Sequence, residues 1–84
     1  MLETQMIRLD EIYVPAKLKK TLDDGKVDTL AESILEKGLE VPIQVRRDEA
    51  RNRFVLVTGL HRLEAVRALG EDMVGALVVS ARKF

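Results

Sequence analysis

The sequence has no cysteine, and this absence excludes disulfide bonds, zinc sites built on thiolates and cysteine nucleophiles. A single histidine is too little for a multi-histidine metal site. One tyrosine, two phenylalanines and no tryptophan argue against a base-stacking platform for single-stranded nucleic acid. The chain also lacks a bilayer-spanning apolar run and a signal-peptide pattern, so we expect a cytoplasmic protein without membrane contact.

Net charge is absent too, because 14 basic side chains balance 14 acidic ones among 84 residues. A chain of zero net charge has no overall attraction to nucleic acid. Its 46% hydrophobic and 33% charged residues are typical of a globular protein. The length predicts a single domain over residues 1–84, and the modest core that it allows is compatible with a homodimer.

The pattern of apolar residues and breakers predicts a small α+β domain with a mixed sheet and elements in the order β-α-β-β-α-β. Pro15 ends the first strand, and the lysine-rich segment 17–21 is expected to be a loop. The predicted strands cover residues 5–14, 41–45, 54–58 and 73–79. One predicted helix starts at residues 23–25 and ends at Gly38, and the other covers about 61–69.

Both helices have apolar residues at helical spacing. The carboxylates of Asp23 and Asp24 suit a helix start, Gly38 suits the end, and Leu39 is placed to pack on Ile34. The residues expected on the apolar faces are Val27, Leu30, Ala31, Ile34 and Leu35 in the first helix, and Leu63, Ala65, Val66, Ala68 and Leu69 in the second.

The segment with the clearest chemistry lies where a buried strand turns into the second helix. A glycine there permits close approach of a ligand, a helix N-terminus offers free N–H groups to an anion, and two cationic side chains add charge. The expected ligand is a phosphate, bound by Thr58, Gly59, Leu60, His61 and Arg62. The alternative is a tight turn at Gly59, with His61 structural and Arg62 a solvated charge.

A polar stripe on the first helix is the second candidate feature. Lys26, Thr29 and Ser33 are spaced i, i+3 and i+7, so they lie on one line beside the apolar face. An ammonium and two hydroxyls on such a line suit a phosphate or a ribose. The alternative is an ordinary solvated flank of the helix.

Two basic clusters are candidates for contact with a DNA backbone. The first comprises Lys17, Lys19 and Lys20, and the second comprises Arg46, Arg47, Arg51 and Arg53. Solubility is the alternative explanation, and Asp48 and Glu49 interrupt the arginine cluster. Asp23 and Asp24 are candidates to hold a magnesium ion beside a phosphate, with helix capping as their alternative role.

Three stretches taken together resemble the ParB N-terminal/sulfiredoxin-like superfamily over residues 21–79. These are T-L-D-D-G-K-V-D-T-L-A-E-S-I at 21–34, G-L-E-V-P-I-Q-V at 38–45 and V-T-G-L-H-R-L-E-A-V-R-A-L-G at 57–70, which contains the G-x-H-R-x-x-A motif. The resemblance implies a shared fold and a nucleotide site for CTP, as in ParB-type partition proteins, or for ATP, as in sulfiredoxins. It also implies that Gly59, His61 and Arg62 form the phosphate turn and that Lys26, Thr29 and Ser33 contact the nucleotide.

The sequence departs from the family pattern at the centre of this motif. Leu60 occupies the position of the essential cysteine of sulfiredoxins, so sulfinic-acid repair is excluded. ParB proteins usually carry a glutamate and an arginine where this chain has Leu60 and His61, which disfavours CTP hydrolysis of the ParB kind. We also expect no helix-turn-helix, because the chain ends at Phe84.

Three functional hypotheses follow. The first is a regulatory module that binds CTP or ATP and cooperates with DNA or a partner protein in plasmid or chromosome partition. The second is a small NTPase, phosphotransferase or nuclease, as some members of the superfamily are. The third is a scaffold with a vestigial nucleotide site. Catalytic candidates for the second hypothesis are His61 as a base and the carboxylates of Asp23, Asp24, Asp28, Glu32 and Glu64.

Overall fold

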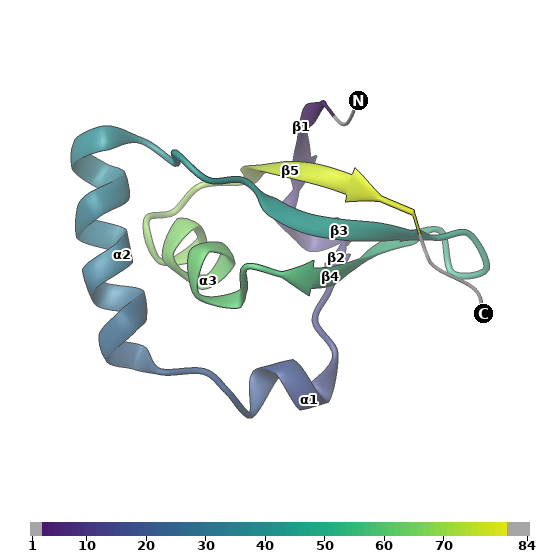
Figure 1. The fold of residues 1–84 in the computed structure, drawn as a ribbon, viewed down its shortest axis with the longest axis horizontal. Coiled ribbons are helices and arrows are strands. Elements are labelled where there is room, and N and C mark those ends of the chain that lie inside the picture. Colours follow the sequence, from purple (N-terminus) through teal and green to yellow (C-terminus); the bar gives the residue numbers. More distant parts are fainter. Residues whose placement is uncertain (1–2, 81–84) are drawn as a thin grey trace.

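A computed structural model describes residues 3–80 of the chain. It has five strands, a 3₁₀ turn and three helices in this part of the chain (Figure 1), which confirms the predicted α+β class with a mixed sheet. In chain order the elements are β1 (Thr4–Arg8), η1 (Leu9–Glu11), β2 (Ile12–Tyr13), α1 (Ala16–Lys19), α2 (Asp24–Lys37), β3 (Ile43–Asp48), β4 (Arg53–Thr58), α3 (Leu60–Ala68) and β5 (Met73–Val79).

The five strands form one sheet in the order β1-β5-β3-β4-β2. Strand β5 pairs antiparallel with β1 and parallel with β3, while β4 pairs antiparallel with β3 and parallel with β2. The apolar strand 54–58 lies inside the sheet, between β3 and β2. The central position belongs to β3, whose Ile43 and Val45 are fully buried.

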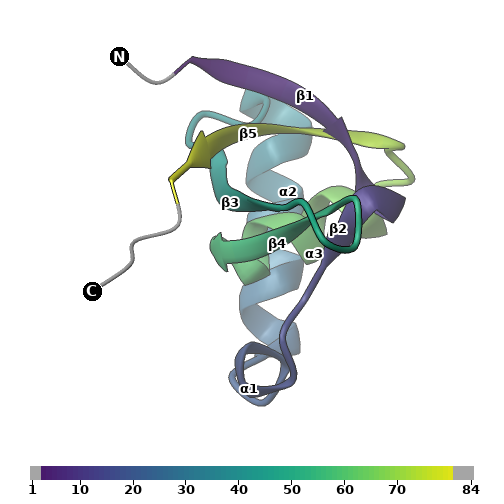
Figure 2. The ribbon, with the colours of Figure 1, turned by 90° about the vertical axis from the view of Figure 1, so that its right-hand side faces the viewer.

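The prediction of one continuous strand over residues 5–14 is wrong. The turn η1 divides it into β1 and β2, which lie at opposite edges of the sheet. A flat five-stranded sheet would be about 19 Å wide, whereas the four steps from Arg8 to Ile12 reach about 14 Å. The sheet therefore coils until its two edges come close enough for this short connection, as Figure 2 shows.

The predicted loop over residues 17–21 is also wrong at its start. Ala16–Lys19 form the single helical turn α1, because the carbonyl of Pro15 accepts the N–H groups of Leu18 (3.0 Å) and Lys19 (3.2 Å). Pro15 itself suits the position before a helix, where a missing N–H costs nothing. Leu18 packs against the core, and the lysines around it stay exposed.

Helix α3 lies between the sheet and α2 (Figure 1), and this layering explains how the helices are buried. Helix α3 buries four residues, whereas α2 buries none completely because it packs mainly on α3, on the side away from the sheet. The predicted apolar faces are therefore too wide: Leu35 is 75% exposed, and Ala68 is exposed as well. The predicted end of α2 is confirmed, since the Gly38 N–H donates to the Ile34 carbonyl at 2.7 Å.

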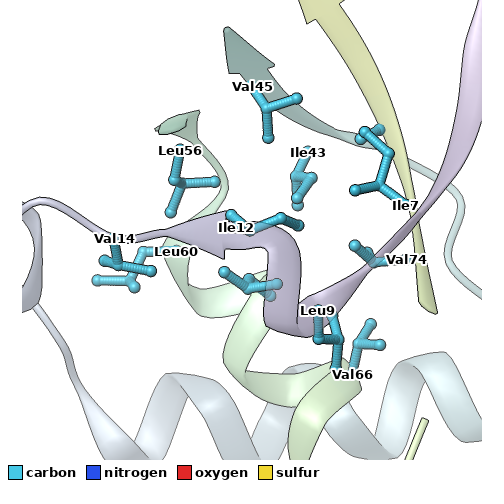
Figure 3. Packing of buried hydrophobic residues seen from close by; sticks show 12 residues of the cluster. Ile7, Leu9, Ile12, Val14, Ile43, Val45, Leu56, Leu60, Val66 and Val74 are labelled. Atoms are coloured by element: carbon cyan, nitrogen blue, oxygen red, sulfur yellow. The ribbon is translucent and has the colours of Figure 1, made fainter. Parts of the chain in front are cut away.

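The core brings together the N-terminal segment, the sheet and α3 (Figure 3). Its members are Ile7, Leu9, Ile12 and Val14 from the first segment, Ile43, Val45, Leu56, Val74 and Ala76 from the sheet, and Leu60, Leu63 and Val66 from α3. Because Leu60, the first residue of α3, is part of this cluster, core packing also positions the N-terminus of that helix.

Gly59 joins β4 to α3 in a conformation that other residues adopt only with strain. Its φ is 102°, in the left-handed region, and an added Cβ would lie 2.8 Å from Cγ2 and 3.1 Å from Cα of Ile43. A contact of 2.8 Å is essentially never made by a real Cβ atom, and one of 3.1 Å is tighter than most. A residue without a side chain is therefore required for α3 to start directly against the central strand.

The β3–β4 hairpin is tied by Asp48, which pairs with Arg53 at 3.3 Å and Arg51 at 3.7 Å. Partial burial acts to raise the pKa of the Asp48 carboxyl, but hydrogen bonds from the Arg51 N–H and the Arg53 guanidinium, together with both positive charges, outweigh it. The net result is a pKa below the usual value for aspartate. The Arg53 guanidinium also stacks over Tyr13, 4.0 Å from its ring centre, and so connects the hairpin to β2.

We expect the Gly59→Ala substitution to destabilise the protein by about 2–4 kcal/mol, because it adds a backbone strain and a steric clash with Ile43. Gly70→Ala is the matched control, since φ at Gly70 is 80° but nothing lies within 4 Å of an added Cβ. The strain alone should cost about 1–2 kcal/mol. Urea denaturation measures both values, and equal losses would show that the approach to Ile43 is unimportant.

We expect Asp48→Asn to lower the free energy of unfolding at pH 7 and to have a smaller effect at pH 3. A carboxyl whose pKa is lowered by folding stabilises the folded state above its ordinary pKa of about 3.9, and this contribution disappears as the pH falls through the lowered value. Urea denaturation at both pH values measures the difference. Glu49→Gln is the control, because the Glu49 side chain is 86% exposed. A pH-independent effect of Asp48→Asn would contradict this account.

Candidate functional site

A cavity of about 710 Å³ lies between the start of α2 and the start of α3. It brings together seven of the candidate site residues that the sequence predicts, although they come from two segments about 30 positions apart. The lining residues are Asp23, Gly25, Lys26, Thr29 and Leu30 from the first segment and Gly59, Leu60, His61 and Arg62 from the second.

The N-terminus of α3 opens onto this cavity. Gly59 occupies the cap position and has no side chain to satisfy the first N–H groups of the helix. The first intrahelical bond is donated by the Leu63 N–H to the Gly59 carbonyl at 2.9 Å, so the N–H groups of residues 60–62 have no partner within the helix. Three such donors and the positive end of the helix dipole attract an anion.

Arg62 brings a positive charge to the same wall of the cavity. Its Nε atom is buried and has no hydrogen-bond partner among the groups of residues 3–80. A buried donor without an acceptor is costly, most of all on a charged group. Arg62 also lines a smaller adjoining hollow of about 240 Å³, so its side chain forms the boundary between the two spaces.

His61 holds the two walls of the cavity together. Its Nε2 atom accepts a hydrogen bond of 3.0 Å from the backbone N–H of Asp23, the residue just before α2. In this contact Nε2 is the acceptor, which leaves Nδ1 as the ring nitrogen that can donate. The nitrogen that a general base would use is thus engaged with the backbone.

Asp23 acts as the cap of α2, because its Oδ1 accepts the N–H groups of Gly25 (2.9 Å) and Lys26 (3.3 Å). Helix capping is thus the alternative role expected for Asp23 from the sequence. Asp24 lies exposed in the first turn. Within residues 3–80 there is no group of three or more His, Asp or Glu side chains that could hold a metal ion. Magnesium at Asp23 and Asp24 stays a prediction.

The predicted polar stripe on α2 is divided between two spaces. Lys26 and Thr29 line the main cavity, and the Thr29 hydroxyl donates to the Gly25 carbonyl at 3.0 Å. Ser33 lines the smaller hollow on the far side of Arg62. Thr58 lines neither space, since it is exposed at the end of β4 opposite Gln44. Leu30 lines the cavity although its spacing assigned it to the core.

The basic clusters lie outside the cavity. Lys17, Lys19 and Lys20 are exposed on and beside α1. The four arginines belong to the β3–β4 hairpin, at the end of the molecule opposite α2 (Figure 1). Most of them are engaged: Arg51 and Arg53 pair with Asp48, while Arg47 lies 3.7 Å from Glu49. Arg46 lines another surface hollow. DNA contact through these groups stays a prediction.

The acidic catalytic candidates are scattered. Asp23 lines the cavity, whereas Glu64 pairs with Arg67 at 3.4 Å and Asp28 and Glu32 are exposed on α2. The geometry therefore suits binding of an anion better than acid–base chemistry.

None of the helices in the described stretch, residues 3–80, has the length and apolar character needed to cross a membrane.

Comparison with protein families gives a match over almost all of the 84 residues. The family model described as "ParB N-terminal domain" matches residues 1–83. The probable chromosome-partitioning protein ParB of Campylobacter jejuni is 39% identical over 77 residues, which cover 90% of this chain and 27% of that protein. The chain thus spans about a quarter of the length of this curated relative.

Two solved structures share the fold. Sulfiredoxin from Arabidopsis thaliana is 28% identical, with a TM-score of 0.79 over 96% of this chain and 86% of that one. The truncated chromosome-partitioning protein ParB from Caulobacter crescentus, solved with CTP-γ-S, is 23% identical, with a TM-score of 0.81 over 96% of this chain and 46% of that one. The resemblance expected from three sequence stretches is confirmed, and the chain belongs to the ParB N-terminal domain family.

Proposed function

We propose that this protein is a nucleotide-responsive module of a partition protein, and that the cavity between α2 and α3 binds the phosphates of CTP or ATP. The observation that carries the proposal is Arg62, which lines that cavity beside the N-terminus of α3 and whose buried Nε has no hydrogen-bond partner within residues 3–80. A phosphate would give this guanidinium an acceptor, and a guanidinium grips phosphate with two parallel hydrogen bonds.

The other groups around the cavity suit the same ligand. The free N–H groups of residues 60–62 would receive one phosphate, and Lys26 on the facing helix would neutralise further charge. Thr29 keeps hydroxyl lone pairs that can accept from a ribose. A volume of about 710 Å³ lies within the range of small-molecule and cofactor sites.

The comparisons support a role in partition. The Caulobacter relative was solved with a CTP analogue, and the Campylobacter relative is named as a probable chromosome-partitioning protein. We infer that the nucleotide serves as a switch and is not rapidly turned over. The one carboxylate lining the cavity, Asp23, already caps α2, and Nε2 of His61 is engaged with the backbone.

Isothermal titration with CTP, ATP, GTP and UTP, with magnesium and with EDTA, tests this proposal. Arg62→Ala should weaken binding about 10- to 100-fold, because hydrogen bonds to charged groups contribute about 1.5–3 kcal/mol. The matched control is Arg67→Ala, which removes an arginine of the same helix that does not line the cavity. No binding by any of the four nucleotides, or equal affinity of the two variants, would overturn the proposal.

A second prediction concerns His61. His61→Gln keeps an oxygen acceptor near the position of Nε2, whereas His61→Leu removes it. We expect the Leu variant to lose nucleotide affinity and amide-exchange protection at Asp23, and the Gln variant to keep most of both. Hydrogen exchange by NMR and the same titrations measure the pair. If both variants lost affinity while Asp23 stayed protected, His61 would act on the ligand and not on the helix.

A further inference from the structure

A second large hollow, about 690 Å³ in volume, lies on another part of the molecule. We call it the β1 groove, because Thr4 and Met6 of β1 form one side of it. The start of β5, the two loops that precede β3 and β5, and Ile34 of α2 and Val66 of α3 form the rest. It shares no lining residue with the cavity between α2 and α3, so it is a separate surface.

The floor of the β1 groove is apolar and partly open to solvent. Met6 is 62% exposed and Met73 is 41% exposed, and Leu39 lines the groove beside them. Met6 and Leu39 converge with Thr4 on Gly75, where an added Cβ would lie 3.3 Å from Thr4 Cγ2 and 4.0 Å from both Met6 Sδ and Leu39 Cδ2. Methionines adapt their shape to different partners, which suits a docking surface.

The rim of the groove is acidic. Glu40, Glu71 and Asp72 line it, and none of them takes part in an ion pair within the part of the chain that the structure describes. The basic residue on β1, Arg8, already pairs with Asp10 at 3.2 Å. An apolar floor between unpaired carboxylates is complementary to an apolar side chain flanked by lysines or arginines.

Strand β1 adds a backbone feature to this surface. It stands at the edge of the sheet and, among residues 3–80, pairs on one side only, with β5. The free edge offers N–H and C=O groups to an added strand. A segment docked there in extended form would place alternate side chains over the groove, as in other cases of strand addition.

We propose that the β1 groove docks an extended, basic segment of a partner protein, with apolar residues that alternate with lysine or arginine. Within residues 3–80, a second copy of this chain presents no such segment. The lysines of this part lie in or beside the helices α1 and α2, and most of the hairpin arginines are engaged by Asp48 and Glu49. This interaction is separate from nucleotide binding and can fail without affecting it.

A fluorescent eight-residue peptide of alternating lysine and valine serves as the probe, and a peptide of alternating glutamate and valine controls for charge. We expect the first peptide to bind the whole chain in fluorescence anisotropy, more weakly at high salt, and the second not to bind. In NMR spectra the amide signals of β1 should shift on binding, while those around Arg62 should not.

Two pairs of variants make the test specific. The double variant Glu40→Lys/Glu71→Lys should lower the affinity for the basic peptide about tenfold or more. Glu32→Lys/Glu36→Lys makes the same change of net charge on the exposed side of α2, outside the groove, and should leave the affinity nearly unchanged. Met6→Gln should weaken binding, whereas Leu35→Gln, at a more exposed residue outside the groove, should not.

Three results would overturn the proposal. One is no binding of the basic peptide, and another is an equal loss of affinity in both double variants, which would show nonspecific charge attraction. The third is self-association of the unmodified chain that Glu40→Lys/Glu71→Lys abolishes in sedimentation experiments. A second copy would then be the occupant of the groove.

Discussion

The close approach of Gly59 to Ile43 is the contact on which the candidate site depends. It allows α3 to begin directly against the central strand, so that the first N–H groups of the helix face the cavity while Leu60 enters the core. Helix α2 is then held against α3 by side chains at its apolar edge and by the bond from the Asp23 N–H to His61. The core therefore fixes α3 as one wall of the cavity, and the position of the other wall, α2, depends on its contacts with α3.

Much of this arrangement was predictable from local sequence patterns. A glycine between a buried strand and a helix, followed by two cationic residues, indicated an anion site, and the spacing of Lys26 and Thr29 placed them on one face of the facing helix. Both segments line one cavity in the structure. Capping by Asp23 and helix termination at Gly38 were equally local, because each depends on hydrogen bonds within a few residues.

Features that depend on distant segments were not predictable in the same way. The buried residues Ile7, Leu9, Ile12 and Val14 do carry a signal for the break at η1, since the step of three from Leu9 to Ile12 interrupts the alternation of a strand. The exposure of Leu35 has no such signal in the sequence, because it follows from α2 packing mainly on another helix. Likewise, the spacing of Ser33 could not show that Arg62 would separate it from the main cavity.

The position of β1 and β2 at opposite edges of the sheet has a consequence for how the protein is made. Among residues 3–80, residues 4–8 pair only with β5, about 70 positions later, and residues 12–13 pair only with β4. Contacts so distant in sequence form slowly, and during synthesis the first strand has no partner until the last has left the ribosome. The unit therefore completes its sheet, and with it the core that supports α3, only after the chain has been synthesised beyond β5.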